Sequence, residues 1–184
     1  QDLKSLNGLT STPGSASYAA TVFLLKRSGL DVNRDVQMTY LASTDPKIWL
    51  NSLESEKVSF EAGVWEPTFT AAVRKGIAFP IFDPADPVEH TRMYGGDVST
   101  LGLVTTTEMI KSNPDLVKRA TDCVEAGLSE IPQAGDQELV EAMESGGISL
   151  DRSDLAAVIR RIRGNFESTG RPSKSKYERA MSAY

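Results

Sequence analysis

Residues 11–18 read STPGSASY and run directly into the apolar segment AATVFLL, so small polar residues stand where a helix begins. Gly14 lets a backbone come close to a bound molecule, and the hydroxyls of Ser15 and Ser17 can donate to it. The same residue types are common in helix caps, so the stretch alone favours a cap over a binding loop. It matches neither a Walker A loop nor a GxGxxG turn.

A second stretch, AGVWEPTF, places Trp65 and Glu66 directly before Pro67. Proline is favoured at the first position of a helix, so we expect both side chains in a turn between a strand and a helix. An aromatic ring and a carboxylate there can stack on a ligand and accept its hydrogen bonds. The alternative, which this stretch alone favours, is a core tryptophan beside a glutamate placed to suit the helix dipole.

Other reactive side chains form no pattern. The sequence has one histidine, His90, and one cysteine, Cys123, so it excludes an internal disulfide framework and a Cys/His zinc site. No spacing links the two residues as nucleophile and base, and structural roles are favoured for both. We therefore expect no catalytic residue, no metal and no cofactor.

Composition limits the class of protein. The chain has 184 residues, of which 40% are hydrophobic, and a formal net charge of -5. This is enough apolar material for a core, and the interspersed Lys and Arg argue against a nucleic-acid partner. The basic run IRRIRGNFESTGR, with Arg160, Arg161, Arg163 and Arg171, is interpreted as a solvated helix face rather than an anion-binding patch. No apolar run approaches the roughly 18 residues of a membrane span.

The first 82 residues alternate strand-like and helix-like segments, which predicts a parallel sheet covered by helices. We expect strands at 7–11, 36–41, 58–65 and 77–82, and helices at 17–29, 45–57 and 66–76. Asp45 is a candidate N-cap, followed by Pro46 at the first helical position.

From Asp83 the pattern changes. The stretch DPADPVEHTRMYGGD (83–97) is rich in Pro, Gly and Asp and predicts a loop, STLGLVTT (99–106) predicts a hinge strand, and helices follow. Pro114 is expected at the start of one helix, and Ser149 and Ser153 are candidate N-caps. The predicted organisation is an α/β ligand-binding lobe at 1–97 and a hinge strand with C-terminal helices at 98–184.

The position of the two polar stretches strengthens their functional interpretation. Each lies at the carboxyl end of a predicted strand, where ligands bind in open α/β sheets. The first also lies at a helix N-terminus, whose unpaired N–H groups and positive dipole attract anions.

Three runs carry a family resemblance: DLKSLNGLTSTPGSASYAATVFLLKRSGLDVNRDVQMTYL, LESEKVSFEAGVWEPTFTAAVRKG and GLVTTTEMIKSNPDLVKRATDCVEAGLSEI. In this order they resemble the second lobe of periplasmic solute-binding proteins of ABC importers. The class is the one that binds nitrate, taurine, alkanesulfonates and thiamine-pyrimidine precursors. The resemblance implies a three-layer lobe of the periplasmic binding protein type II fold with a mostly parallel sheet, followed by a helical C-terminal part.

The resemblance also implies a set of ligand contacts. In this sequence they fall on Ser11, Gly14, Ser15, Ala16, Ser17, Tyr18, Ser43, Trp65 and Glu66. Ser59 and Glu61 depart from the family pattern, as does the lead-in DLKSLNG. The ligand remains open, because Glu66 would disfavour an anion whereas the helix start at Ser15 would favour one.

The resemblance implies a soluble, non-enzymatic importer component of the periplasm or another extracytoplasmic space, which captures a small-molecule solute and works with an ABC permease. A sensory module and an enzyme on the same fold are the alternatives. Family members begin with a first-lobe half that this chain lacks, so we expect a fragment. Its C-terminal helices, with apolar residues Leu116, Val117, Val124 and Leu128, would belong against that missing lobe. Without it, we expect self-association, binding of a partner chain or an altered helix packing.

Overall fold

The N-terminal half of the molecule is built on a three-stranded parallel sheet in strand order β2-β1-β3. The computed structural model describes residues 3–98 and 101–183. The strands are β1 (Asn7–Ser11), β2 (Gln37–Leu41) and β3 (Phe60–Glu61), and Leu9 of β1 lies opposite Thr39 and Glu61. The predicted parallel sheet is confirmed for these three strands.

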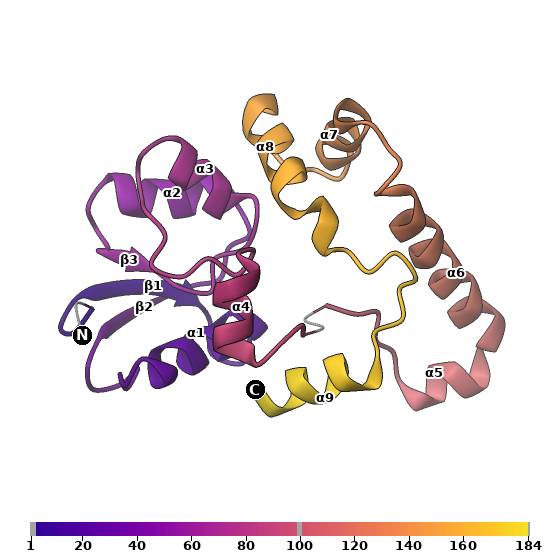
Figure 1. The fold of residues 1–184 in the computed structure, drawn as a ribbon, viewed down its shortest axis with the longest axis horizontal. Helices are drawn as coiled ribbons and strands as arrows, with labels where there is room; N and C mark the ends of the chain where they lie inside the picture. Colours follow the sequence, from indigo (N-terminus) through magenta and orange to yellow (C-terminus); the bar gives the residue numbers. More distant parts are fainter. Residues whose placement is uncertain (1–2, 99–100, 184) are drawn as a thin grey trace.

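Helices cover both faces of this sheet and give a three-layer lobe (Figure 1). The helix α1 (Ala16–Arg27) covers one face, and α2 (Pro46–Glu54) and α3 (Thr68–Arg74) cover the other. Leu25 of α1 packs with Phe60 in one apolar cluster, while Leu9 packs with Trp49 of α2 in a second. Burial of these side chains, worth about 1.5–3 kcal/mol each, fixes the sheet between its helices.

Local sequence signals explain where these helices begin and end. The Asp45 side chain accepts a hydrogen bond from the Lys47 backbone N–H, so the predicted N-cap of α2 is confirmed. The last turn of α1 carries Lys26 and Arg27, cations that suit the negative end of the helix dipole. The helix α3 begins after Pro67, which follows a cis peptide bond to Glu66.

Two predicted strands differ from the structure. The strand predicted at 58–65 is limited to the two residues of β3, because Gly63 turns the chain with φ 67°. The strand predicted at 77–82 is wrong: these residues form no strand, since Pro80 lacks a backbone N–H to pair and Phe79 and Ile81 are exposed.

The hinge strand predicted at 99–106 is also absent over residues 101–106, which are exposed and form no regular element. Apolar side chains such as Leu101 and Val104 find no neighbouring strand there. Residues 99 and 100 of that prediction lie outside the described residues.

The segment predicted as a loop contains a helix, α4 (Pro87–Tyr94), so the prediction is wrong for these residues. Its start is set by Asp86, whose side chain accepts from the N–H groups of Val88 and Glu89. Gly95 ends it with a positive φ of 76°. The helix packs on α1 through stacked rings of Phe23 and Tyr94, whose centroids lie 5.3 Å apart.

The C-terminal half is helical, as predicted. It comprises α5 (Thr107–Ser112), α6 (Pro114–Glu130), α7 (Asp136–Ser145), α8 (Arg152–Ile162), the 3₁₀ turn η1 (Arg163–Asn165) and α9 (Lys174–Ala183). Pro114 begins α6 as expected, whereas the N-cap position of α8 is Asp151, without a side-chain capping hydrogen bond, rather than Ser149 or Ser153.

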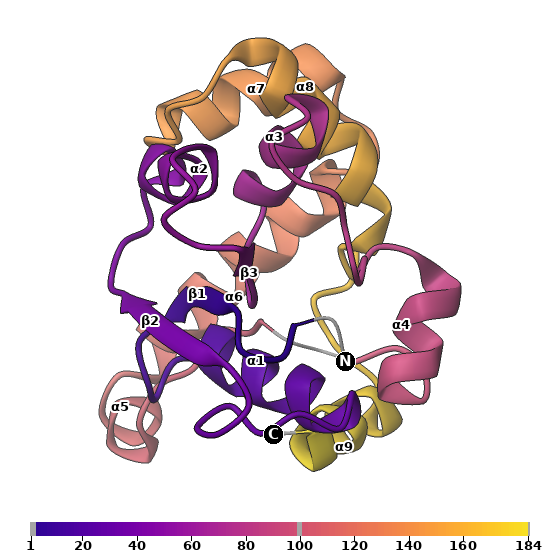
Figure 2. The same ribbon diagram turned by 90° about the vertical axis from the view of Figure 1, so that its left-hand side faces the viewer.

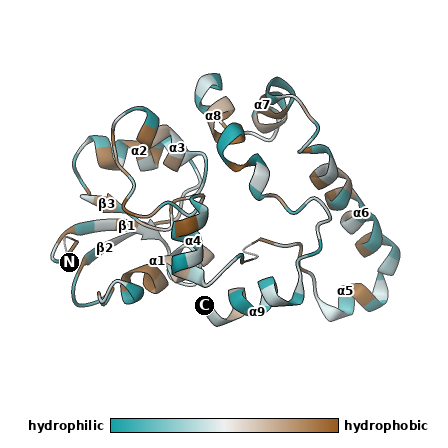
Figure 3. Cartoon of the chain, viewed as in Figure 1, coloured by the Kyte–Doolittle hydropathy of each residue, from teal (hydrophilic) through white to brown (hydrophobic). Residues whose placement is uncertain are grey.

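The helices of this half differ in how much they bury. Val140 of α7 packs with Leu155 and Ile159 of α8, and this hairpin lies close to α3 in both views (Figure 2). In contrast, α6 buries none of its residues, although brown apolar bands alternate with teal along its length (Figure 3). Leu116 and Val124 are 50% and 45% exposed. Within 3–98 and 101–183, no helix has the length and apolarity that crossing a membrane requires.

Candidate binding cavity

A cavity of about 210 Å³ lies at the carboxyl ends of the strands. Residues of both polar stretches line it, together with residues that follow β2: Ser11, Ser17, Ser43, Thr44, Trp49, Gly63 and Trp65. Four of these, Ser11, Ser17, Ser43 and Trp65, are predicted site residues. The structure therefore brings together side chains that lie up to 54 positions apart in the sequence. None of the lining residues is charged.

The first turn of α1 forms one side of the cavity. Ser15 is its N-cap, and the Ser15 Oγ accepts from the Tyr18 N–H at 3.1 Å, so this hydroxyl serves as a cap. Ser17 lines the cavity, and its carbonyl accepts from the Thr21 hydroxyl at 2.8 Å. The N–H groups of Ala16 and Ser17 belong to the first helical turn and so lack acceptors within the helix. These groups supply positive potential beside the Ser17 hydroxyl.

Gly63 fits closely against this helix start. Its φ is 67°, and a Cβ placed on it would lie 2.3 Å from the Ser17 carbonyl oxygen and 2.8 Å from the Thr21 Oγ1. Any side chain would push the turn after β3 away from α1. Glycine at position 63 therefore brings the two polar stretches to opposite sides of one small cavity.

The residues after β2 form a third side. The Trp49 indole N–H donates to the Ser43 carbonyl at 2.9 Å, which ties the turn to α2. The Ser43 hydroxyl accepts from the Asp45 N–H at 3.1 Å and lies next to the N-cap of that helix. Both side chains line the cavity, with the Trp49 donor already used.

Trp65 differs from Trp49 in its hydrogen bonding. Its Nε1 is buried and has no hydrogen-bond partner among the described residues. A buried N–H without an acceptor costs about 1–3 kcal/mol. Because Trp65 lines the cavity, a ligand atom or a water that accepts from this N–H would remove the cost.

The remaining predicted site residues do not line the cavity. Gly14 has a φ of 90° with open space around it, which shapes the turn before Ser15. Ala16 is exposed, and the Tyr18 ring meets the Tyr40 ring edge to face at 5.8 Å. Glu66 is turned toward the C-terminal half instead.

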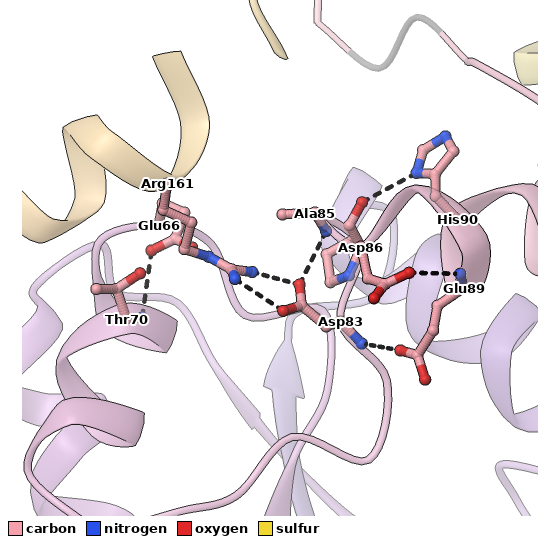
Figure 4. Close-up of polar contacts among 9 residues, drawn as sticks. Glu66, Thr70, Asp83, Ala85, Asp86, Glu89, His90 and Arg161 are labelled. Atoms are coloured by element: carbon pink, nitrogen blue, oxygen red, sulfur yellow. Dashed lines mark hydrogen bonds and ion pairs between the residues drawn. The ribbon is translucent and has the colours of Figure 1, made fainter. Parts of the chain in front are cut away.

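Glu66 belongs to an ion-pair cluster that centres on Arg161 of α8 (Figure 4). The Arg161 Nε donates to Glu66 Oε1 at 2.7 Å, and its Nη1 donates to Asp83 Oδ2 at 2.7 Å. The Nη2 donates to Asp83 Oδ1, which makes this pair bidentate. The other Glu66 oxygen accepts from the Thr70 N–H at 3.2 Å. The hydrogen bonds from Arg161 hold the pKa of the Asp83 carboxyl below its usual range.

This geometry corrects the interpretation of the basic run as a solvated face. Arg161 is 22% exposed and pairs with two carboxylates, and its guanidinium lies 4.5 Å from the centre of the Phe69 ring. Arg163 pairs with Asp136 and donates to three backbone carbonyls. Arg160 and Arg171 are exposed, as expected, although each pairs with a carboxylate.

Glu61, the last residue of β3, is a half-buried carboxyl that lies outside this cluster. Burial raises its pKa to about 8, and its Oε1 has no hydrogen-bond partner among the described residues. At neutral pH the side chain is therefore mainly protonated and uncharged.

A larger hollow of about 440 Å³ lies between α7 and α8. It is lined by Asp136, Gln137, Val140, Arg152, Ser153 and Ala156. Asp136 already pairs with Arg160 and Arg163, and this hollow lies away from the strand ends. We therefore place the candidate site in the smaller cavity, where strand ends and a helix N-terminus meet.

Neither of the two reactive side chains noted above lies at the cavity. His90 is on α4, where its Nδ1 lies 3.1 Å from the Pro84 carbonyl oxygen and its ring packs near Tyr94. Cys123 is exposed on α6. Among the residues that the structure describes, no three His, Cys, Asp or Glu side chains are grouped to hold a metal ion.

Comparison with known proteins places the fold. No protein-family model matches the sequence, and no curated protein does. Three solved structures align over 99% of this chain. The first is a protein from Bordetella bronchiseptica, with a TM-score of 0.83 and 18% sequence identity. The other two are the alkanesulfonate-binding protein SsuA from Xanthomonas axonopodis pv. citri bound to MOPS, with a TM-score of 0.67 and 15% identity, and the periplasmic aliphatic sulphonate binding protein SsuA from Escherichia coli, with a TM-score of 0.65 and 19% identity. The chain has the fold of the periplasmic binding proteins. It spans 56%, 55% and 52% of the lengths of these three structures.

Sequence reasoning missed four residues that the site uses: Thr44, Trp49, Gly63 and Arg161. A glycine inside a strand-like run is a known sign of close backbone approach, so Gly63 carried a signal. Trp49 lies at a regular helical position, and nothing local distinguishes it from a core residue. The partners of Arg161 lie 78 and 95 positions away, beyond any local pattern.

Proposed function

We propose that this chain is the ligand-binding lobe of the substrate-binding component of an ABC-type importer, and that it captures a small organic or oxyanion solute. The observation that carries the proposal is the cavity at the strand ends. There the hydroxyl residues Ser11 and Ser17, the first turn of α1 and Trp65, whose buried indole N–H has no partner among the described residues, come together without a charged side chain. Uncharged donors at a helix N-terminus suit an anion or a strongly polar acceptor.

The placement of Glu66 supports an anionic ligand over a cationic one. The carboxylate pairs with Arg161 and accepts from the Thr70 N–H, so its charge is neutralised outside the cavity lining. An anionic solute near Trp65 therefore faces helix-dipole attraction without an opposing free carboxylate.

The comparisons support a solute-binding role and point to sulfonates as the first class to test. Two of the similar structures are described as alkanesulfonate- or aliphatic sulphonate-binding proteins, one of them bound to MOPS. The cavity of about 210 Å³ is smaller than the roughly 300–1,000 Å³ of typical ligand sites. We infer that it forms one wall of a larger site in a two-lobed, extracytoplasmic protein that delivers solute to a permease and performs no chemistry.

Titration followed by tryptophan fluorescence tests this proposal, since Trp49 and Trp65 both line the cavity. The probes are MOPS, methanesulfonate, nitrate, bicarbonate, phthalate and an aminopyrimidine. We expect a saturable change with at least one probe, of low affinity because one wall encloses little of the ligand surface.

Two serine variants give a matched comparison. Ser17→Ala removes a hydroxyl from the cavity and should weaken binding about tenfold, as expected for a lost hydrogen bond to a charged group. Ser153→Ala removes a hydroxyl from the hollow between α7 and α8 and should leave affinity unchanged. Equal losses in the two variants, or no saturable response to any probe, would count against the proposal.

A further inference from the structure

The ion-pair cluster around Arg161 joins parts of the molecule that lie far apart in the sequence. Arg161 is on α8, Glu66 is in the turn before α3, and Asp83 is in the segment before α4. The three side chains are mostly shielded from solvent, with exposed fractions of 22%, 18% and 24%. Figure 4 shows the guanidinium between the two carboxylates.

The geometry of this cluster fixes the position of the turn before α3, whereas it adds little to the stability of the fold. A bidentate guanidinium–carboxylate pair defines both distance and orientation, which a lysine cannot do. In contrast, partly buried ion pairs gain little net stability, because desolvation offsets most of the attraction. The main effect of Arg161 is therefore to fix the positions of Glu66 and Asp83.

Glu66 is the neighbour of Trp65 in the chain, so a force on Glu66 acts directly on the backbone of Trp65. Trp65 lines the cavity, and the Trp65 carbonyl accepts from the N–H groups of Thr68 at 3.1 Å and Phe69 at 3.4 Å. The guanidinium of Arg161 also lies over the Phe69 ring. Arg161 thus contacts two residues that follow Trp65 closely in the chain, Glu66 and Phe69, without lining the cavity itself.

The helix α8 gives Arg161 a rigid base. Leu155, Val158 and Ile159 of α8 are buried, and Asp154 pairs with Arg74 of α3 at 3.0 Å. Asp154, Val158 and Arg161 follow at i, i+4 and i+7 and so share one face of α8, which is the face that meets α3 and carries the guanidinium to the turn.

We propose that Arg161 is a positioning residue for the binding cavity: through Glu66 and Asp83 it sets the place of the Trp65 indole, and so couples α8 to the site. The importance of this coupling for binding rests on the proposed function. The position of Trp65 can nevertheless be measured without any ligand.

Fluorine NMR of the protein labelled with 5-fluorotryptophan provides that measurement. The chain has two tryptophans, so two resonances are expected, and Trp65→Phe assigns them. In Arg161→Met the Trp65 resonance should shift or broaden by more than its linewidth, while the Trp49 resonance stays in place. Arg161→Lys keeps the charge but loses the bidentate geometry, so it should give an intermediate change.

Arg74→Met is the matched control, because it removes the Arg74–Asp154 ion pair from the same α3/α8 contact without touching Glu66. It should leave both resonances in place. If Arg161→Met does not fold, Asp83→Asn weakens the cluster from its other side and should move Trp65 in the same direction.

The proposal is overturned if Trp65 is unmoved in a folded Arg161 variant, or if Arg74→Met gives the same change. It is also overturned if the Trp49 and Trp65 resonances move together, which would indicate general loosening. Titration of the same samples with each of the probes named above separates the two proposals: a moved Trp65 resonance with no response to any of these probes supports the positioning role and rejects the binding function.

Discussion

At the scale of single residues, hydrogen-bond partners separate the side chains that can meet a solute from those that cannot. Ser15 is used as a helix cap and Glu66 is paired with Arg161, whereas the Trp65 indole N–H has no partner among the described residues. These differences could not be predicted from residue types, because serine and glutamate suit either role.

The cavity was partly predictable at this scale. Ser11 and Ser17 follow from the position of a polar stretch between a strand and a helix, and Trp65 from the turn after another strand. Gly63 was not predicted, because its role depends on contact with the Ser17 carbonyl oxygen. Arg161 could not be predicted at all, since its partners lie in distant segments.

Glu61 gives a prediction about pH. Burial raises its pKa from 4.5 to about 8, so between these values the folded chain holds a proton that the unfolded chain releases. The free energy of unfolding should therefore fall as pH rises from about 4.5 to about 8. The lowered pKa of Asp83 acts only at more acid pH, where its contribution is lost as the carboxyl is protonated.

Urea unfolding at pH 5, 6.5 and 8 measures this dependence. Glu61→Gln, which is neutral throughout, should flatten the decline and be at least as stable as the parent at pH 8. Glu54→Gln, an exposed change on α2, should follow the parent at every pH. An unchanged decline in Glu61→Gln would show that Glu61 is not the group responsible.

At the scale of elements, local signals predicted the three described strands and most helices, while boundaries depended on contacts. The helix α4 was predicted as a loop because Pro, Asp and Gly dominate its sequence. In the structure these residues mark its ends, with Asp86 as cap, Pro87 at the first position and Gly95 after the last. The strand predicted at 77–82 fails because no neighbouring strand pairs with it.

Two leucines on C-terminal helices test how differently these elements are packed. Leu155 on α8 is fully buried, whereas Leu116 on α6 is 50% exposed. Leu155→Ala should lower the free energy of unfolding by about 2–5 kcal/mol, because it leaves a cavity in a closed core. Leu116→Ala should cost under about 0.5 kcal/mol, as surface changes usually do.

Chemical denaturation at low protein concentration measures both variants. Similar losses for the two leucines would contradict the assignment of α8 to the packed part of the molecule and of α6 to its exposed part.

At the scale of the whole molecule, the fold is that of the periplasmic binding proteins, yet the region from residue 101 to the end of α6 is largely exposed. Residues 101–110 are exposed, and α6 buries none of its side chains. The chain also spans little more than half of the structures that it resembles. Exposed apolar side chains such as Leu101, Leu116 and Val124 are available there for contact with another protein surface.

We therefore expect the isolated chain to self-associate through this region. Sedimentation velocity should show a weight-average mass that rises with concentration. The double variant Leu116→Lys with Val124→Lys should sediment as a monomer, because like charges would then meet across the contact. A compact monomer at all concentrations, without binding of a hydrophobic dye, would contradict this expectation.

We propose above that a small polar solute binds where β1, α1 and the turn after β3 meet. Amide NMR titration with MOPS, and with methanesulfonate as the smaller analogue, tests it most directly. Saturable shifts are expected at Ser11, Ser17 and Gly63 and at the Trp65 indole N–H, with none near Ser153. Saturable shifts centred on the hollow between α7 and α8, or no shifts with any of the probed solutes, would contradict it.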